Sequence, residues 1–276
     1  RSGCDWSSDV CSSDLGQFSN LWIELASRLG LEPEICEGDW RGGAIAEVIE
    51  ERLLADKTKQ IKAVCIVHNE TSTGALSNVK AVRNAIDNAK HPALFLVDTI
   101  SGLGSADYKH DEWGVDVTIT GSQKGLMLPP GLGFNAVSEK AVAASKSAKL
   151  SRSYWDWASQ LANNPTGNLP YTPATNLVYG LLEACDMLME EGLENVFARH
   201  ERHAEATRRA VRTWGFEIQC SEPKEYSPVL TGVIMPSGHD ADALRSVILE
   251  KYNMSLGADR KSVVEGKSVD LGGGRI

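Results

Sequence analysis

The sequence lacks any long run of apolar residues and has no excess of positive charge. The longest apolar stretches, such as 63–67 and 93–97, are far too short to cross a bilayer. Lys and Arg number 28 against 37 Asp and Glu, which gives a net charge of −9. The chain therefore has no electrostatic basis for binding nucleic acid or an acidic membrane. Small-molecule chemistry remains the class to test.

Cysteine motifs and dinucleotide-binding motifs are also missing. The six cysteines form neither a Cys-x-x-Cys motif nor a spacing typical of a disulfide framework, so we expect reduced thiols and a cytoplasmic location. The Gly-Leu-Gly segments at 102–104 and 131–133 do not extend to the full glycine pattern of a nicotinamide site. His200 and His203 share a predicted helix without converging carboxylates or thiolates, so we expect no metal site there.

Two terminal segments have a composition unlike the rest of the chain. Residues 1–15 show neither a strand nor a helix period, and residues 259–276 interrupt a regular alternation and end in glycines. Both resemble translated sequencing adapters, so we predict that they are non-native and that the native part, about 16–258, is truncated at both ends.

Between these ends, helical and strand patterns alternate. Helical periods at 19–32, 45–55 and 79–89 are interleaved with short apolar runs that stop abruptly in polar residues. These runs are predicted strands at 62–68, 93–98, 116–121 and 131–138. Helices between buried strands imply crossover connections, so we predict an α/β fold with a mostly parallel sheet.

The second half of the chain predicts a smaller unit. Long helices are expected at 172–192 and 193–215, followed by a strand at 229–236 and a helix at 240–252. We therefore predict a large domain with its linking helix at 16–192 and a partial, smaller C-terminal α/β domain at 193–258.

Asp98 and Lys124 each follow a predicted buried strand. The carboxyl ends of neighbouring parallel strands meet at one edge of a sheet, where ligands collect. Two opposite charges there suit a structural ion pair, but they also suit opposite ends of pyridoxal phosphate. A lysine amine can form a Schiff base with its aldehyde, and a carboxylate can keep its ring nitrogen protonated. Either residue alone is a weak signal.

Hydroxyl and amide side chains lie at the same predicted edge. Thr71 and Ser72 follow the first of these strands, and Ser122 and Gln123 come directly before Lys124. Such clusters commonly serve turns, yet their location also suits a phosphate or a ring hydroxyl. Glycines and prolines after Lys124 restrain the backbone of the loop that carries it.

Four segments in this order carry a family resemblance: VHNETSTG (67–74), LVDTISGLGS (96–105), GSQKGLMLPPGLGF (121–134) and YTPATNLVYGL (171–181). Together they resemble the class V, fold-type I aminotransferases that depend on pyridoxal phosphate, nearest to the members that act on serine and glyoxylate. The resemblance covers about 16–258. It implies a mostly parallel large-domain sheet with a smaller C-terminal α/β domain, a homodimer with a shared active site, and no nucleic-acid or membrane partner.

The resemblance also implies a role for each matching residue. Lys124 would bond to the cofactor aldehyde and transfer protons, and Asp98 would pair with the pyridinium nitrogen. Thr71 and Ser72 would lie near the ring hydroxyl, and Gln123 would lie near the phosphate beside Ser122. Thr172 would reach the phosphate across the dimer interface.

The implied reaction moves the amino group of L-serine to glyoxylate and gives hydroxypyruvate and glycine. Alanine as the donor is the alternative, and a non-catalytic fragment is a third possibility. The family's Gly-rich phosphate loop, its ring-stacking aromatic residue and its arginine for the substrate carboxylate have no counterpart in 16–258. We therefore expect this chain to bind the cofactor weakly and to transaminate poorly.

Overall fold

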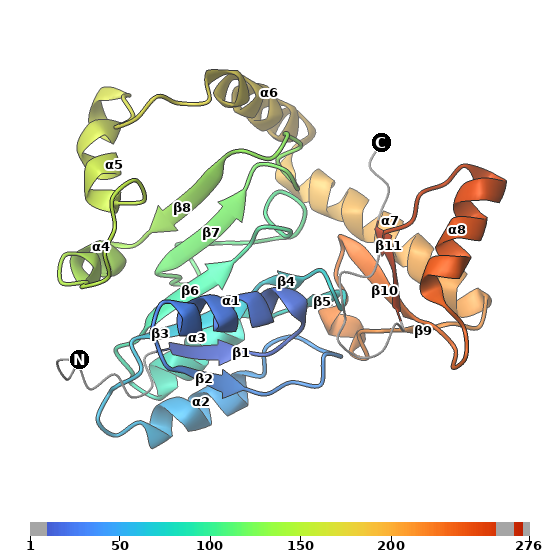
Figure 1. Cartoon of the computed structure of the whole chain (residues 1–276), viewed down its shortest axis with the longest axis horizontal. Coiled ribbons are helices and arrows are strands. Elements are labelled where there is room, and N and C mark those ends of the chain that lie inside the picture. Colours follow the sequence, from blue (N-terminus) through green and yellow to red (C-terminus); the bar gives the residue numbers. More distant parts are fainter. Residues whose placement is uncertain (1–9, 258–267, 273–276) are drawn as a thin grey trace.

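A six-stranded sheet forms the centre of the computed structural model, which describes residues 10–257 and 268–272 (Figure 1). The strand order is β2-β1-β3-β6-β7-β8. The strands are β1 (Val10–Ser13), β2 (Pro33–Cys36), β3 (Ala63–Val67), β6 (Leu94–Asp98), β7 (Val117–Gly121) and β8 (Gly133–Val137). All neighbours are parallel except β8, which pairs antiparallel with β7. The predicted mostly parallel α/β sheet is confirmed.

The first strand corrects one expectation about residues 1–15. Val10–Ser13 pair with β2 on one side and β3 on the other, and all four residues are buried. A segment expected to have no regular structure therefore supplies an interior strand. Its non-native origin stays a prediction, and Cys4 and Trp6 lie outside the described residues.

The core lies where α2 (Ala46–Ala55) and α3 (Val79–Asn88) cover the sheet. The Asn78 side chain accepts a hydrogen bond from the Ala81 backbone N–H and so caps the start of α3. From there Val82 and Ile86, one helical turn apart, become fully buried against the sheet, where Phe95 of β6 is also fully buried. Each such side chain contributes about 2–3 kcal/mol by leaving water.

Helix α1 (Gln17–Arg28) has the opposite character. Its predicted helical period is confirmed, but Leu21, Leu25 and Leu29 are about half exposed. The side chains turned toward the sheet include Ser19 and Ala26, which are buried, and Trp22, which is half-buried. An apolar period in the sequence thus marks the outer face of this helix.

After β8 the chain forms an arm of helices at one side of the sheet (Figure 1). These are α4 (Glu139–Ser145), α5 (Trp157–Asn163), the short 3₁₀ helix η1 (Asn164–Thr166) and α6 (Thr175–Glu191). The arm exposes large apolar side chains, among them Trp155, Tyr179 and Leu182. No helix in the described part of the chain is long and apolar enough to cross a membrane.

A second unit lies at the other side of the molecule (Figure 1). It contains α7 (Leu193–Thr213), β9 (Glu217–Ile218), η2 (Pro223–Glu225), β10 (Leu230–Ile234), α8 (Ala241–Tyr252) and β11 (Ser268–Gly272). Strand β10 pairs antiparallel with β9 and with β11. Strand β11 lies within residues 259–276, whose non-native origin stays a prediction.

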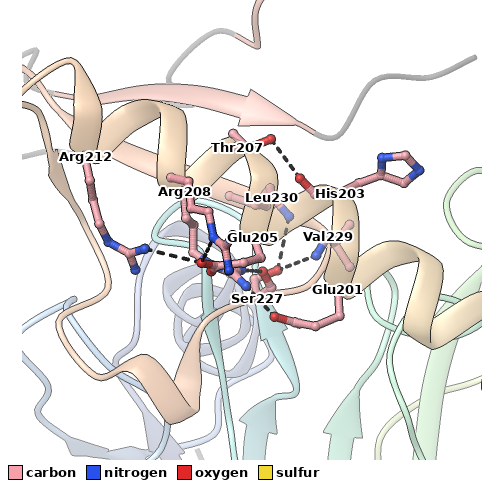
Figure 2. A network of polar contacts seen from close by, with 10 residues as sticks. Glu201, His203, Glu205, Thr207, Arg208, Arg212, Ser227, Val229 and Leu230 are labelled. Carbon is pink, nitrogen blue, oxygen red and sulfur yellow. Dashed lines mark hydrogen bonds and ion pairs between the residues drawn. The ribbon is translucent and has the colours of Figure 1, made fainter.

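Arg208 of α7 lies at the junction between this unit and the large sheet. Its side chain is buried, contacts Glu201 and Glu205, and donates a hydrogen bond of 3.2 Å to the Ser227 carbonyl (Figure 2). Its guanidinium carbon also lies 5.1 Å from the centre of the Tyr226 ring. The Ser227 backbone N–H in turn donates to the Gly74 carbonyl. Arg208 thus holds the segment that connects the second unit to the loop after β3.

Candidate active site

The ends of β3, β6 and β7 meet at one edge of the sheet, as the sequence predicts. Asp98, the last residue of β6, pairs with Val67 of β3 and with Ile119 of β7. Backbone bonds continue past the strands: His68 N–H donates to the Asp98 carbonyl, and Thr99 N–H donates to the Ile119 carbonyl, each at 2.8 Å. The loops that contain Thr71, Asp98 and Lys124 therefore leave the sheet side by side.

Asp98 is buried, with only 7% of its surface exposed. Its Oδ1 accepts a hydrogen bond of 2.8 Å from the Ile100 backbone N–H, and its Oδ2 accepts one of 2.9 Å from the Trp22 indole N–H. Burial raises the pKa of Asp98, and these two hydrogen bonds act in the opposite direction. The carboxyl group is therefore removed from water and held by two hydrogen bonds, one from the backbone of the loop after β6 and one from a side chain of α1.

Lys124 lies in a tight loop between β7 and β8 and is half-buried. The Lys124 carbonyl accepts a hydrogen bond from the Met127 N–H, which closes a turn directly after the lysine. Ser122 ties the rest of the loop together, because its hydroxyl donates to the Pro129 carbonyl at 2.8 Å and accepts from the Leu132 N–H at 3.2 Å. Ser122 was predicted to contact the cofactor; its hydroxyl already supports the loop that holds Lys124.

Gly125 brings the Lys124 loop against the loop that follows Asp98. A Cβ on Gly125 would collide with the Leu103 carbonyl oxygen and would stand 2.7 Å from the Ser105 hydroxyl. Gly104 has a φ of 76°, and a Cβ there would lie 3.1 Å from the Gly125 carbonyl oxygen. The backbones after Asp98 and Lys124 thus pack directly on each other, which only glycine at position 125 permits.

The loop after β3 is anchored by Glu70, a residue that the sequence analysis missed. Glu70 is fully buried, and its Oε2 accepts hydrogen bonds from the Phe18 and Ser19 backbone N–H groups at 3.1 and 3.0 Å. A carboxylate there satisfies free donors at the N-terminus of α1, whose N-cap residue, Gly16, has no side chain to do so. Burial raises the pKa of Glu70, while these bonds and those from Ser72 lower it.

Ser72, predicted near the ring hydroxyl, takes part in the same network. Its hydroxyl donates to Glu70 Oε1 at 2.7 Å and accepts from the Gln17 N–H at 2.9 Å. Gly16, with a φ of 153°, leaves room for this contact, since a Cβ there would collide with the Ser72 hydroxyl. In this structure the Ser72 hydroxyl therefore helps to hold the N-terminus of α1 in place.

The remaining predicted residues have different positions. Thr71 and Gln123 are half-buried at the sheet edge, each beside the segment expected from the sequence. Thr172 is exposed and lies outside the sheet, in the segment that leads into α6. Helix α6 itself approaches the Lys124 loop, because a Cβ on Gly131 would stand 2.6 Å from Leu177 Cδ1. Thr172 is thus the predicted residue that the fold leaves solvent-facing.

A cavity of about 1040 Å³ lies beside this edge, between α2, α3 and the second unit. Its lining includes Gly43, His68 and Tyr226 but none of the predicted site residues. Burial lowers the pKa of His68 to about 4, which leaves the imidazole neutral near pH 7. We place the candidate site at the strand ends, because Asp98 ends β6 there and the loop with Lys124 follows the adjacent strand β7. Within the described residues, no group of three or more His, Cys, Asp and Glu could hold a metal ion.

Residues 7–258 match the sequence profile of the family described as aminotransferase class-V. The chain belongs to this family. It is 50% identical over 268 residues to the serine–glyoxylate aminotransferase of Methylorubrum extorquens, and the matched region covers 95% of this chain and 66% of that protein. It is 44% identical over 248 residues to the L-aspartate–glyoxylate aminotransferase of Paracoccus denitrificans, with 90% of this chain and 63% of that protein covered.

A solved structure agrees with this assignment. The fold superposes on an alanine–glyoxylate aminotransferase from Nostoc sp. with a TM-score of 0.84 at 27% identity, and the match covers 97% of this chain and 71% of that chain. The chain spans slightly less than two thirds of the two curated relatives, at 66% and 63% of their lengths. These matches establish the family.

Proposed function

We propose that this chain is the core of a pyridoxal-phosphate-dependent aminotransferase that moves the amino group of L-serine to glyoxylate, giving hydroxypyruvate and glycine. The observation that carries the proposal is the position of Asp98 and Lys124 after adjacent parallel strands in a member of this family. The identity of 50% to a serine–glyoxylate aminotransferase supports serine as the donor.

The residues present fit the cofactor. Asp98 offers a buried carboxylate with Oδ1 bound by the backbone and Oδ2 bound by one side chain, which leaves acceptor capacity for a ring N–H. Lys124 offers an amine on a loop restrained by Ser122 and Gly125. When bound, pyridoxal phosphate supplies an electron-poor ring that accepts the electron pair released as the substrate Cα–H bond breaks.

The residues of this chain would do the remaining work. Lys124 Nζ would accept the proton from the substrate Cα and return it to the neighbouring cofactor carbon, so a fixed backbone that limits its reach is an advantage. Asp98, in its ionised form, would keep the ring nitrogen protonated. Thr71, Gln123 and Thr172 remain proposed contacts to the ring hydroxyl and the phosphate. Ser72 and Ser122 support them by holding α1 and the Lys124 loop.

Two of the relatives are named for donors other than serine, one for alanine and one for L-aspartate. The structural match to an alanine–glyoxylate aminotransferase makes alanine the second candidate. Glyoxylate as the acceptor is common to all three relatives described. We therefore propose glyoxylate as the acceptor and serine before alanine as the donor.

A homodimer with shared active sites and a cytoplasmic location complete the proposal. Thr172 is exposed here, and the arm around it also exposes Tyr154, Trp155 and Tyr179. A second copy covering this arm would bury these side chains and bring Thr172 to a neighbouring site. The described cysteines, Cys11, Cys36, Cys65, Cys185 and Cys220, are all free thiols, which suits a reducing compartment.

Lysine labelling tests the chemistry. The chain is incubated with pyridoxal phosphate, reduced with borohydride and digested, and the modified peptide is identified by mass spectrometry. We expect the label on Lys124 and its loss in Lys124→Ala, while Lys146→Ala, at an exposed position on the surface, keeps it. A label that survives Lys124→Ala would contradict the proposal. Glycine formation from glyoxylate with serine, alanine or aspartate then ranks the donors.

A further inference from the structure

Trp22 connects α1 to the buried carboxylate of Asp98 in the candidate site. Its indole Nε1–H donates to Asp98 Oδ2 across a distance of 2.9 Å. The other oxygen, Oδ1, is bound by the Ile100 N–H within the same loop as Asp98. The backbone therefore fixes Oδ1 of this carboxylate. Among the hydrogen bonds found in the described residues, the indole of Trp22 alone fixes Oδ2.

The fold holds the indole in place from several directions. Ser19, Trp22 and Ala26 lie on one face of α1, since positions three and four apart are neighbours on a helix. Ser19 and Ala26 are buried toward the sheet, whereas Leu21 and Leu25 on the other side are exposed. Glu70 binds the first turn of α1 through the Phe18 and Ser19 N–H groups. These contacts fix the position of α1 along its axis and its rotation about that axis, and so they place the Trp22 indole against Asp98.

We propose that Trp22 is a positioning residue for Asp98, with its indole N–H orienting Oδ2 and favouring the ionised carboxylate that the cofactor ring requires. This role rests on the proposed function. Burial raises the pKa of Asp98, and the bond from Trp22 acts against that effect. A charge-assisted hydrogen bond is shorter and stronger than one between two neutral groups. Trp22 therefore stabilises the charged form at a site from which water is largely excluded.

The bond to Trp22 leaves room for a second donor. A carboxylate oxygen has two lone pairs, so Oδ2 can accept from the indole and from a ring N–H together. Without the indole, Asp98 would keep only the Ile100 contact and could rotate about its side chain. The ring nitrogen would then meet a carboxylate that is less ordered and more easily protonated.

The hydrogen bond itself is tested without any cofactor. Indole N–H signals are recorded by ¹⁵N–¹H NMR, and Trp22→Phe identifies the Trp22 signal by its absence. We expect this signal downfield of the exposed indoles and displaced in Asp98→Asn, which keeps the shape and loses the charge. A Trp22 signal that is unchanged in Asp98→Asn would overturn the inference, whatever the outcome for the proposed function.

Cofactor binding tests the positioning role. We expect Trp22→Phe to weaken pyridoxal phosphate binding about tenfold, the effect of losing one hydrogen bond to a charged group, and to change the absorption and circular dichroism of the bound cofactor. The matched control is Trp40→Phe, because Trp40 Nε1 makes an equivalent bond of 2.7 Å to Asp14 Oδ1. Circular dichroism in the far ultraviolet verifies that both variants fold.

The outcomes separate the two proposals. Equal affinities and spectra for Trp22→Phe, Trp40→Phe and the unmodified chain would overturn the positioning role while the proposed function stands. A chain that takes up no pyridoxal phosphate on Lys124 would overturn the proposed function and the role toward the cofactor, and the NMR result would still decide the bond between Trp22 and Asp98.

Discussion

The carbonyl oxygen of Leu103 occupies the space where a side chain on Gly125 would begin. This contact joins the loop after Asp98 to the loop that carries Lys124, and it admits no Cβ. The close packing of the two loops therefore depends on Gly125, which has no side chain and takes no part in the proposed reaction.

Gly125→Ala should accordingly destabilise the protein by about 2 kcal/mol or more, because one of two packed backbones must shift. Chemical denaturation measures the change. Gly133→Ala is the matched control, since a Cβ at Gly133 meets nothing within 4 Å, and we expect its stability to stay within about 1 kcal/mol of the starting value. Similar losses in both variants would contradict the assigned contact.

Glu70→Gln should loosen the start of α1. Both carboxylate oxygens of Glu70 accept hydrogen bonds, so an amide would place its NH₂ against N–H or O–H donors and cost about 2 kcal/mol. Faster hydrogen exchange at Phe18 and Ser19 would report the change. Glu225→Gln serves as the control, because in Glu225 only Oε2 accepts a bond, from the Gly43 N–H at 2.8 Å, and an amide oxygen can replace it. Unchanged exchange at Phe18 and Ser19 in Glu70→Gln would refute the capping role.

Arg208→Met should separate the second unit from the loop after β3. The change leaves the buried Ser227 carbonyl without this donor and removes the contact with Tyr226, which together cost about 2–3 kcal/mol. Thermal unfolding and limited proteolysis between α7 and β10 are the measurements. Arg209→Met, which loses only the exposed pair with Glu205, should change stability by less than about 0.5 kcal/mol. Equal effects of the two changes would rule out a special role for Arg208.

His68 should make the protein less stable in mild acid. Burial lowers its pKa from 6.5 to about 4, so between these values the unfolded chain binds a proton that the folded chain does not. Stability is therefore complete above pH 6.5 and falls as the pH drops toward 4, by up to roughly 3 kcal/mol. His68→Phe, which keeps an aromatic ring against Tyr108, should flatten this slope. Burial also lowers the pKa of His91 and His200, so part of the slope should remain. An unchanged slope in His68→Phe would show that the proton is bound elsewhere.

The sequence was sufficient to predict β3, β6 and β7, because each is an apolar run buried in the sheet and followed by polar residues. It was insufficient for β1, whose residues include two serines. The strand conformation of Val10–Ser13 comes from pairing on both sides, and a local pattern does not contain that information. Similarly, nothing local indicated that β8 would return antiparallel beside β7.

The same division holds for the candidate site. The positions of Asp98 and Lys124 at the ends of adjacent strands were predictable, because each follows a recognisable strand and the carboxyl ends of parallel strands lie at one edge of a sheet. The hydroxyl partners of Ser72 and Ser122 were not, since they depend on Gln17, Glu70 and Pro129 arriving from elsewhere in the fold. Trp22 was counted only as part of an apolar helical period. One signal for Glu70 was present: a helix that starts at a glycine needs an acceptor from another segment.

Asp98 ends β6 and the loop that carries Lys124 follows β7, and these two strands are hydrogen-bonded neighbours, about 4.8 Å apart along the direction of the ladder bonds. The starting points of the two functional loops are therefore held at a fixed spacing by backbone hydrogen bonds inside the large sheet, to which no strand of the C-terminal unit contributes.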